Sequence, residues 1–385
     1  MKHINILFAC LLLGAVGATL FLTQPEPEVN EVATIIKDPV QVRIVATGEI
    51  APYQTVSFRA QTPSGYFYEP FFSEIRPFLE NNHLTICPQD APIASGETGV
   101  AGYPLFNAPT SFARDIAKAG CNSIALANDH IGDKGIEGAL TTKTEWEQQN
   151  PILLSGVLDT ASPLPSIDYT TIEGVTFAFA SVTDVLPLGD AVDAVATTED
   201  AAALAATISE ARDNADYVIV SIHWGIEEVA ELQPRQTELA NIIAEAGADL
   251  IIGTGPQALQ TVETITNGER STTVYYSLGN LLTTQLNLEQ LIVGLAVVNV
   301  TIQDSAIIDH NYSFLPTYMH YTWSENDISR TNYLGRDNLK IHPLDQATEV
   351  FAESEWPTTI EQQQESVRNL IQASNAATVI DSQDF

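Results

Sequence analysis

Short runs of β-branched and aliphatic residues recur along the chain, and stretches with helical spacing separate them. Residues 109–119 and 234–246 have the spacing of amphipathic helices, and a glycine follows each. Strands that alternate with helices build parallel βαβ units. The alternation therefore predicts an α/β protein. The apolar runs are VRIVAT from residue 42, LTIC from 84, NSIAL from 122, YVIVSI from 217, DLIIG from 249 and TVYYSL from 273.

Two further stretches have the pattern of antiparallel strands. Residues 162–183 contain a Glu-Gly-Val turn between two β-like runs, and residues 291–315 alternate on both sides of Asp304. A mixed α/β fold with two sheets, arranged as an α-β-β-α sandwich, accommodates both kinds of strand. Beyond about Leu315 the pattern weakens, and residues 321–385 are expected to form a C-terminal extension with a Gln-rich helix and a polar tail.

The N-terminal segment predicts delivery to a membrane. Residues 4–22 are almost wholly apolar and long enough to cross a bilayer as a helix. Lys2 precedes this run, while Glu26 and Glu28 are the first charges after it, so the positive-inside rule places the body outside the cytoplasm. Residues 23–40 are rich in Pro and Glu and are expected to form a tether.

Two other interpretations of this segment remain open. A cleavable secretory signal also begins with a Lys and a short apolar run, and Val16 and Ala18 fit its cleavage site. Cys10 loosely fits a lipoprotein site, although few apolar residues precede it. All three interpretations place the body of the protein outside the cytoplasm.

The chain is strongly acidic. It has 16 Lys and Arg against 49 Asp and Glu, which gives a net charge of −33. Such a charge repels nucleic acid and anionic lipid surfaces, so we expect no nucleic-acid partner. A solubilising surface is the simplest explanation of the acidity.

The cysteines predict no disulfide. Besides Cys10 there are only Cys87 and Cys121, too few for a disulfide scaffold. If Cys87 ends one strand and Cys121 begins its neighbour, their Cα atoms lie beyond bonding reach. We therefore expect both to be buried small residues.

Polar residues and glycines follow each predicted strand. Because loops at the carboxyl ends of strands meet at one edge of an open sheet, ligands bind there in α/β folds. Carboxylates, an Asn and two His that arrive from separate strands suit a divalent metal, although a single His after a strand is more often structural. These loops are Gly48-Glu49, residues 88–91 (PQDA), Asn128-Asp129-His130, His223-Trp224-Gly225, residues 253–257 (GTGPQ) and residues 277–280 (SLGN).

Four spaced motifs make the sequence similar to a known family. They are ALANDHIGDKGIEG at residues 125–138, SIHWGIEE at 221–228, LANIIAEAGADLIIGTGPQALQ at 239–260 and YYSLGN at 275–280. Together they resemble the CapA family of poly-γ-glutamate capsule biosynthesis proteins. The resemblance covers about residues 41–320 and implies a sandwich of the calcineurin-type metallophosphatase class, attached to an N-terminal membrane anchor. It favours retention of that anchor.

The resemblance also implies roles for individual residues. The family's Gly-Asp appears as Gly48-Glu49, its Asn-Leu-Glu as Pro88-Gln89-Asp90, and its His-Trp-Gly is intact at residues 223–225. By this correspondence Asn128 and His130 are the catalytic candidates, and the candidate metal ligands are Glu49, Asp90, Asn128 and His223. Asp133, Trp224, Gln257 and Asn280 are expected to complete the cleft.

One loop departs from the family pattern. Where the family carries Gly-His-His-Pro-His or a close variant, this chain has Gly253-Thr254-Gly255-Pro256-Gln257, so the histidines of that loop are missing. A two-metal hydrolase needs enough ligands for both ions. The remaining candidates suit at most one ion such as Mg²⁺ or Mn²⁺. Alternatively, Asn128 and His130 only pin loops, Trp224 only packs, and Gly225, Gly253 and Gly279 serve turns.

The expected function is support of capsule polymer synthesis, export or attachment at the cell membrane, with the body outside the cytoplasm. The expected partners are the membrane, other capsule-synthesis membrane proteins and an anionic polymer of the poly-γ-glutamate type. The charge of −33 opposes contact with a polyanion unless cations screen it. Two alternatives are a metal-dependent hydrolase of phosphoester or amide bonds and a pseudoenzyme scaffold.

Overall fold

The computed structural model describes residues 38–385 except 95, 97, 98, 159–164, 188, 324–331 and 355. These residues belong to one structural unit, Lys37–Phe385. The predicted membrane segment and most of the predicted tether lie outside the described residues. Within the described part, no helix combines the length and apolar character needed to span a bilayer.

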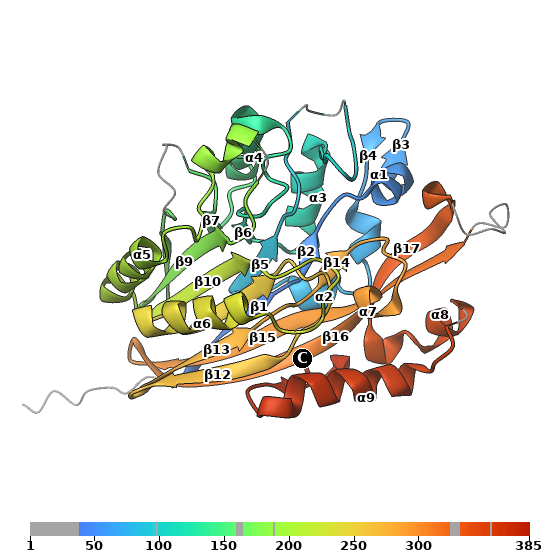
Figure 1. Cartoon of the computed structure of the whole chain (residues 1–385). Coiled ribbons are helices and arrows are strands. Elements are labelled where there is room, and N and C mark those ends of the chain that lie inside the picture. Colours follow the sequence, from blue (N-terminus) through green and yellow to red (C-terminus); the bar gives the residue numbers. More distant parts are fainter. Residues whose placement is uncertain are drawn as a thin grey trace, which may run out of the picture. The chain divides into compact units, whose positions relative to one another are not determined.

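The first sheet has eight strands and mixes parallel with antiparallel pairs. Its order is β17-β16-β15-β1-β5-β6-β7, and β18 pairs with β16. The neighbours β1, β5, β6 and β7 are parallel, whereas β15, β16 and β17 run antiparallel (Figure 1). The strands are β1 Val40–Ala46, β5 Leu84–Pro88, β6 Ser123–Ala125, β7 Leu153–Ser155, β15 Ile292–Gln303, β16 Ala306–Trp323, β17 Arg336–Pro343 and β18 Thr378–Val379.

The second sheet has six strands in the order β12-β13-β11-β10-β9-β8. Its four central strands are parallel, and the edge strands β12 and β8 are antiparallel to their neighbours. The strands are β8 Asp168–Ile172, β9 Val175–Thr183, β10 Tyr217–His223, β11 Leu250–Thr254, β12 Val262–Asn267 and β13 Arg270–Tyr275.

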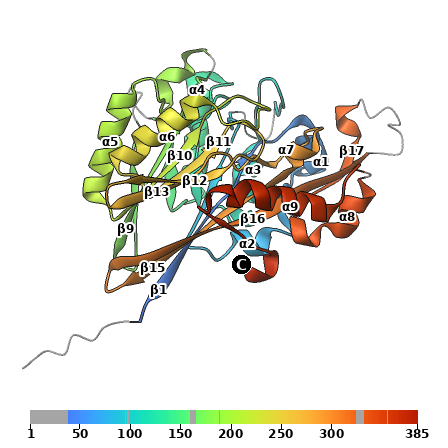
Figure 2. The same cartoon turned by 60° about the horizontal axis from the view of Figure 1, so that its bottom comes forward.

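The helices connect the strands and cover the sheets. In Figure 2, α5 and α6 lie side by side against the second sheet, and α9 lies near β16. Two short strand pairs complete the fold, β2 Glu49–Ile50 with β14 Asn280–Leu282 and β3 Gln61–Thr62 with β4 Gly65–Tyr66. The helices are α1 Gln54–Ala60, α2 Arg76–Leu79, α3 Thr110–Ala119, α4 Gly135–Glu147, α5 Ala201–Asn214, α6 Pro234–Ala246, α7 Leu288–Leu291, α8 Thr348–Glu353 and α9 Ile360–Ile371, with short 3-10 helices at Glu69–Phe72, Gly189–Ala194, Tyr333–Gly335, Leu344–Gln346, Gln372–Ser374 and Ser382–Asp384.

Strand β10 shows how the core is divided. Tyr217 and Ile219 belong to the main core, which also contains buried residues of the first sheet. Val218, Val220 and Ile222 instead pack in a second cluster with residues of α5 and α6. Because successive side chains of a strand point to opposite faces, the odd-numbered residues of β10 face the first sheet.

The two-sheet α/β sandwich is confirmed, and the predicted helices and strands are present. The Glu173-Gly174 turn joins antiparallel β8 and β9, and Asp304 and Ser305 join β15 to β16. The structure differs beyond Leu315, where β16 continues to Trp323. Residues 313–321 are all buried, so this part of the strand lacks the alternation of a half-exposed strand. The polar tail also differs, because it contains β18 and contacts the first sheet.

The prediction that Cys87 and Cys121 remain unbonded is wrong. They form a disulfide with a Cα–Cα distance of 5.8 Å. Cys121 does not begin β6, which starts at Ser123. It lies instead in the turn after α3, where Gly120 has a φ of 121° and the Cys121 N–H donates to the Ile116 carbonyl. This turn brings the sulfur within reach of Cys87 on β5.

We expect loss of this disulfide to destabilise the protein. The bond joins residues 34 positions apart, so it restricts the unfolded chain. The double variant Cys87→Ala/Cys121→Ala should lose about 2 to 4 kcal/mol of unfolding free energy in denaturant titrations. A reducing agent should destabilise the wild type but not this variant. Equal sensitivity of the two proteins to reductant would contradict the assignment.

We expect the buried His320 to lower the free energy of unfolding in acid. Burial and the neighbouring His342 lower the pKa of His320 to about 4. The unfolded chain, with a pKa of about 6.5, takes up this proton first. Stability is therefore complete above about pH 6.5 and falls as the pH drops toward 4, by about 1 to 2 kcal/mol at pH 5.

Unfolding titrations at pH 7.5 and pH 5 test this expectation, with His320→Gln as the comparison. The variant should show a smaller loss of unfolding free energy than the wild type between the two pH values. Equal losses would show that His320 does not carry the effect.

Candidate functional site

Glu49 is fixed by a close approach of two backbone segments. Its N–H donates to the Gly279 carbonyl at 2.9 Å, and it pairs with Asn280 between β2 and β14. A Cβ on Gly48 would lie 2.3 Å from the Gly279 oxygen, so only glycine permits this approach. The Glu49 side chain is thereby held in the interior, with 1% of the residue exposed.

His223 connects the second sheet to this carboxylate. It ends β10 in the odd-numbered register that faces the first sheet. Its Nδ1 donates to Oε1 of Glu49 at 2.6 Å, and its Nε2 lies 3.1 Å from Oδ1 of Asp129. Burial alone would lower the pKa of His223, but the charges of Glu49 and Asp129 raise it well above its usual value. The ring is therefore a buried imidazolium between two carboxylates.

Asn128 holds the loop after β6 in place. Its Oδ1 accepts the N–H groups of His130 at 3.1 Å and Ile131 at 2.7 Å. Its Nδ2 donates to the Gln89 carbonyl at 2.6 Å, which links this loop to the one after β5. These bonds are the loop-pinning role expected as the alternative to catalysis or metal ligation, and they orient Asp129 and His130.

His130 is a second imidazolium at the same edge. Its Nδ1 donates to Oδ2 of Asp133 at 2.9 Å, and its ring packs edge-on against Phe106. Burial would lower the pKa of His130, but the bond to Asp133 and the charges of Asp90 and Asp129 raise it to about 10. Without a cation beside it, this group can donate a proton or stabilise an anion at neutral pH. A cation bound at its Nε2 would displace that proton.

Several buried oxygens nearby lack a hydrogen-bond donor among the described residues. They include Oε2 of Glu49, Oδ1 of Asp90 and Oδ1 of Asn280. Burial, followed by the charge of Glu49, raises the pKa of Asp90 well above its usual value. An acceptor oxygen without a donor is costly in the interior, so this concentration of oxygens suits a cation.

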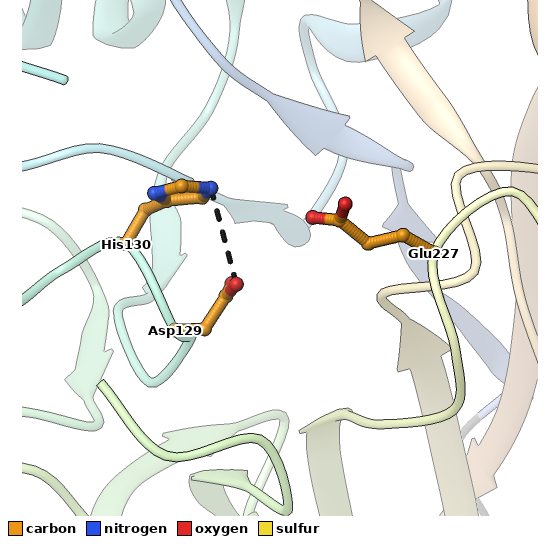
Figure 3. A group of neighbouring side chains, drawn as sticks. All are labelled: Asp129, His130 and Glu227. Carbon is orange, nitrogen blue, oxygen red and sulfur yellow. Dashed lines mark ion pairs between the residues drawn. The ribbon is translucent and has the colours of Figure 1, made fainter. Parts of the chain in front are cut away.

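A more open group of possible ligands adjoins these oxygens. Asp129, His130 and Glu227 each place one ligand atom within 4.8 Å of the others, and theirs is the group of this kind found among the described residues. Figure 3 shows Asp129 and His130 on one loop, with Glu227 directed toward them from another. The His130 Nε2 and Asp129 Oδ2 atoms are 3.9 Å apart. Glu227 follows β10, so the group joins loops of both sheets.

The loop at residues 253–257 provides packing in place of ligands. The Oε1 atom of Gln257 accepts the Gln285 side-chain amide at 2.5 Å. A Cβ on Gly255 would lie 2.2 Å from the Trp224 carbonyl oxygen, so a histidine there would displace Trp224. The packing of this loop against Trp224 therefore leaves no room for a histidine at position 255.

Trp224 itself is a packing residue, as the structural alternative expects. It is fully buried, stacks on Tyr276 and donates from Nε1 to the Tyr276 carbonyl at 2.8 Å. Gly253 allows this contact, because a Cβ there would lie 2.1 Å from the same carbonyl oxygen. The expectation that Gly253 serves a turn is thus corrected: it lies within β11 and serves a close approach. Gly225 and Gly279 do have positive φ angles.

Comparison with known proteins decides the family. The model of the bacterial capsule synthesis protein PGA_cap matches residues 43–285. The chain belongs to this family. It is 35% identical to the PGA biosynthesis protein CapA of Bacillus subtilis over 157 residues, which are 40% of this chain and 40% of that protein. It is 32% identical to the capsule biosynthesis protein CapA of Bacillus anthracis over 176 residues, 43% of this chain and 41% of that protein. The matched segments thus span less than half of these PGA_cap relatives.

Two solved structures align with this PGA_cap chain at low sequence identity. The calcineurin-like phosphoesterase YfkN from Bacillus subtilis aligns with 14% identity and a TM-score of 0.41, covering 72% of this chain and 91% of that one. The 5'-nucleotidase from Candida albicans aligns with 12% identity and a TM-score of 0.39, covering 71% of this chain and 51% of that one.

Most of the predicted site residues lie around one edge of this PGA_cap domain, whereas Trp224 packs in the second core cluster. Two further residues of the site are not sequence candidates. Glu49 and His223 are in direct contact, and Asn128 orients the loop that carries Asp129 and His130. Asp129 and Glu227 were not among the candidates, although both lie inside quoted motifs, NDH and HWGIEE. The position of Asp129 between two site candidates, Asn128 and His130, is the signal that identifies it. The roles of all these residues stay predictions.

The residues present suit one divalent cation better than a pair of them. Asp129, His130 and Glu227 would hold it, and the donor-free oxygens of Glu49, Asp90 and Asn280 lie in the same cluster of charges. Oxygen donors with one imidazole suit Mg²⁺ or Mn²⁺. A bound ion would supply positive charge for a carboxylate or phosphate oxygen. The imidazolium of His223 already neutralises part of the negative charge of Glu49 and Asp129, which limits the site to few ions.

We expect Mn²⁺ to stabilise the folded protein through Glu227. A saturating ion that binds only the folded state adds about 2.7 kcal/mol at 100 times its Kd. Thermal unfolding should therefore show a higher Tm with Mn²⁺ in the wild type and a smaller shift in Glu227→Gln, with a Kd at least about tenfold weaker.

Glu231→Gln is the matched control for this measurement. It removes the same charge from the same exposed loop but lies outside the ligand group. It should retain the wild-type shift in Tm. Equal shifts in all three proteins, or none in any, would contradict a cation site at Glu227.

Proposed function

We propose that this protein is a membrane-tethered component outside the cytoplasm that supports the synthesis, export or attachment of a poly-γ-glutamate-type capsule polymer. The observation that carries the proposal is the PGA_cap match over residues 43–285. The matched segment contains Asp129, His130 and Glu227. The names of the two CapA relatives indicate the polymer class.

The placement outside the cytoplasm has two lines of support. The apolar run at residues 4–22, with Lys2 before it and acidic residues after it, has the charge pattern of an N-in anchor. The Cys87–Cys121 disulfide adds support, because disulfides persist in oxidising compartments and are rare in the cytosol. Either a retained anchor or a cleaved signal agrees with both observations.

The proposed cation addresses the repulsion between protein and polymer. A chain with a net charge of −33 opposes the approach of a polyanion. A divalent ion held by Asp129, Glu227 and the deprotonated ring of His130 would give carboxylates of the polymer a local positive contact. Binding to poly-γ-glutamate should therefore require Mg²⁺ or Mn²⁺ and weaken in chelator.

Deletion of the gene in its native host tests the capsule role. We expect the surface polymer to fall at least about tenfold and to return when the wild-type gene is supplied, by immunostaining and by glutamate content of the extracted polymer. A Glu49→Gln gene should restore little, because that change removes one of the two charges that hold His223. Glu231→Gln should restore the polymer fully.

The deletion also has a result that excludes the proposal. Polymer at the wild-type amount in the deletion strain would remove the capsule role. Polymer that is made but released into the medium would restrict the role to attachment. Pull-down with poly-γ-glutamate that fails at every salt and Mg²⁺ concentration would remove direct polymer binding.

A metal-dependent hydrolase is the second candidate, favoured by the His130–Asp133 pair. The imidazolium of His130 is placed at the open edge of the cluster, where it could protonate a leaving group. Purified protein with Mn²⁺ and a generic phosphoester, compared with His223→Ala, separates the candidates. Equal background rates in both proteins would exclude this hydrolase and leave a scaffold that binds partners through the same cleft.

A further inference from the structure

A cavity of about 620 Å³ lies beside the group formed by Asp129, His130 and Glu227. The proposed cation site assigns no role to this cavity. Glu227 belongs to both, and Tyr53, which also lines the cavity, accepts a hydrogen bond from the Asn280 amide at 3.3 Å. Pockets of about 300 to 1,000 Å³ hold small ligands or short polymer segments. The cavity is thus large enough for two or three amino-acid units.

Side-chain amides dominate the lining of this cavity. They belong to Gln54, Gln257, Gln285, Asn287 and Gln290. An amide carries both a donor and an acceptor, so it can pair with either half of a peptide bond. The lining therefore suits a chain that is itself built from amide bonds.

Gln290 points to a ligand that offers an acceptor. Only 3% of this residue is exposed, and its Nε2 has no hydrogen-bond partner among the described residues. A buried donor without an acceptor costs about 1 to 3 kcal/mol. An oxygen of a ligand in the cavity would satisfy it.

Charges of both signs line the cavity. Arg336 of β17 is 3% exposed, donates to the Thr284 carbonyl and lies over the rings of Tyr321 and Trp323 at 5.3 Å. These contacts hold its positive charge in place. Glu227 and Glu228 contribute negative charge from the loop after β10. A ligand that carries a carboxylate and an ammonium group matches this arrangement, whereas a uniform polyanion does not.

We propose that this cavity binds the amino-terminal end of a γ-linked glutamyl chain, with an α-carboxylate directed to Arg336 and Gln290 and the free ammonium directed to Glu228. The inference rests on the proposed function and extends it by naming the part of the polymer that is recognised. The chain end carries the polymer's own positive charge, so it can approach an acidic protein that repels the interior of the chain. Arg336 lies outside the matched residues 43–285, so the C-terminal extension contributes to specificity.

Calorimetry on the full chain in detergent tests this inference with defined probes. They are a γ-linked glutamate trimer with a free amino end, the same trimer N-acetylated, an α-linked trimer and maltotriose. We expect binding of the free γ-linked trimer, and binding at least about tenfold weaker for the acetylated and α-linked trimers. Maltotriose should not bind.

Gln290→Leu separates recognition from structure. It removes the buried donor with little change in volume, so binding should weaken by about tenfold while the Tm stays equal or rises. A purely structural role would lower the Tm instead. Gln148→Leu, an exposed amide outside the cavity, should leave both values unchanged.

The remaining outcomes contradict either the inference or the proposed function. Equal affinity for the free and acetylated trimers would remove recognition of the chain end, and wild-type affinity in Gln290→Leu would remove the assigned contact. Preference for maltotriose would identify a sugar pocket. If no trimer binds at millimolar concentration but deletion of the gene still abolishes the polymer, this inference fails and the proposed function stands. If the trimer binds and deletion has no effect, the proposed function fails.

Discussion

The contact between His223 and the carboxylates of Glu49 and Asp129 organises the functional edge of this protein. It joins three backbone segments that are far apart in sequence: the end of β10, the short strand β2 and the loop after β6. A buried imidazolium needs both carboxylates, because removing one partner of a buried ion pair leaves an uncompensated charge and costs about 3 to 5 kcal/mol. The two sheets are therefore held in register at the edge where the cluster lies.

Smaller contacts make this arrangement possible. Gly48 allows β2 to approach Gly279, which fixes Glu49, and Asn128 fixes the turn that carries Asp129. Gly253 and Gly255 give space to Trp224. Trp224 follows His223 in the sequence, but its side chain packs on the opposite face of the sheet. The loop at residues 253–257, which has no histidine, takes part in this packing. The described residues consequently offer ligands for one ion rather than two.

The cleft combines a part that the family shares with a part from outside the family match. The carboxylate and histidine cluster comes from residues within 43–285, whereas Arg336 comes from β17. Since β17 pairs with β16 in the first sheet, the C-terminal segment is structurally continuous with the rest of the fold. Its contribution to the cavity follows from that pairing.

Periodicity in the sequence predicted the strands, the main helices and the edge at which polar residues would meet, because these depend on local patterns. Motif order predicted the family, and it placed His223, Asn128 and His130 among the site candidates, whose roles stay predictions. Tertiary structure alone decided that Cys87 and Cys121 bond, that Asp129 and Glu227 join the cluster, and that Gln257 faces Gln285. It also decided that β16 extends to Trp323, since a strand buried on both faces carries no alternating signal. Each of these outcomes depends on distances between segments remote in sequence, which side-chain spacing along the chain does not encode.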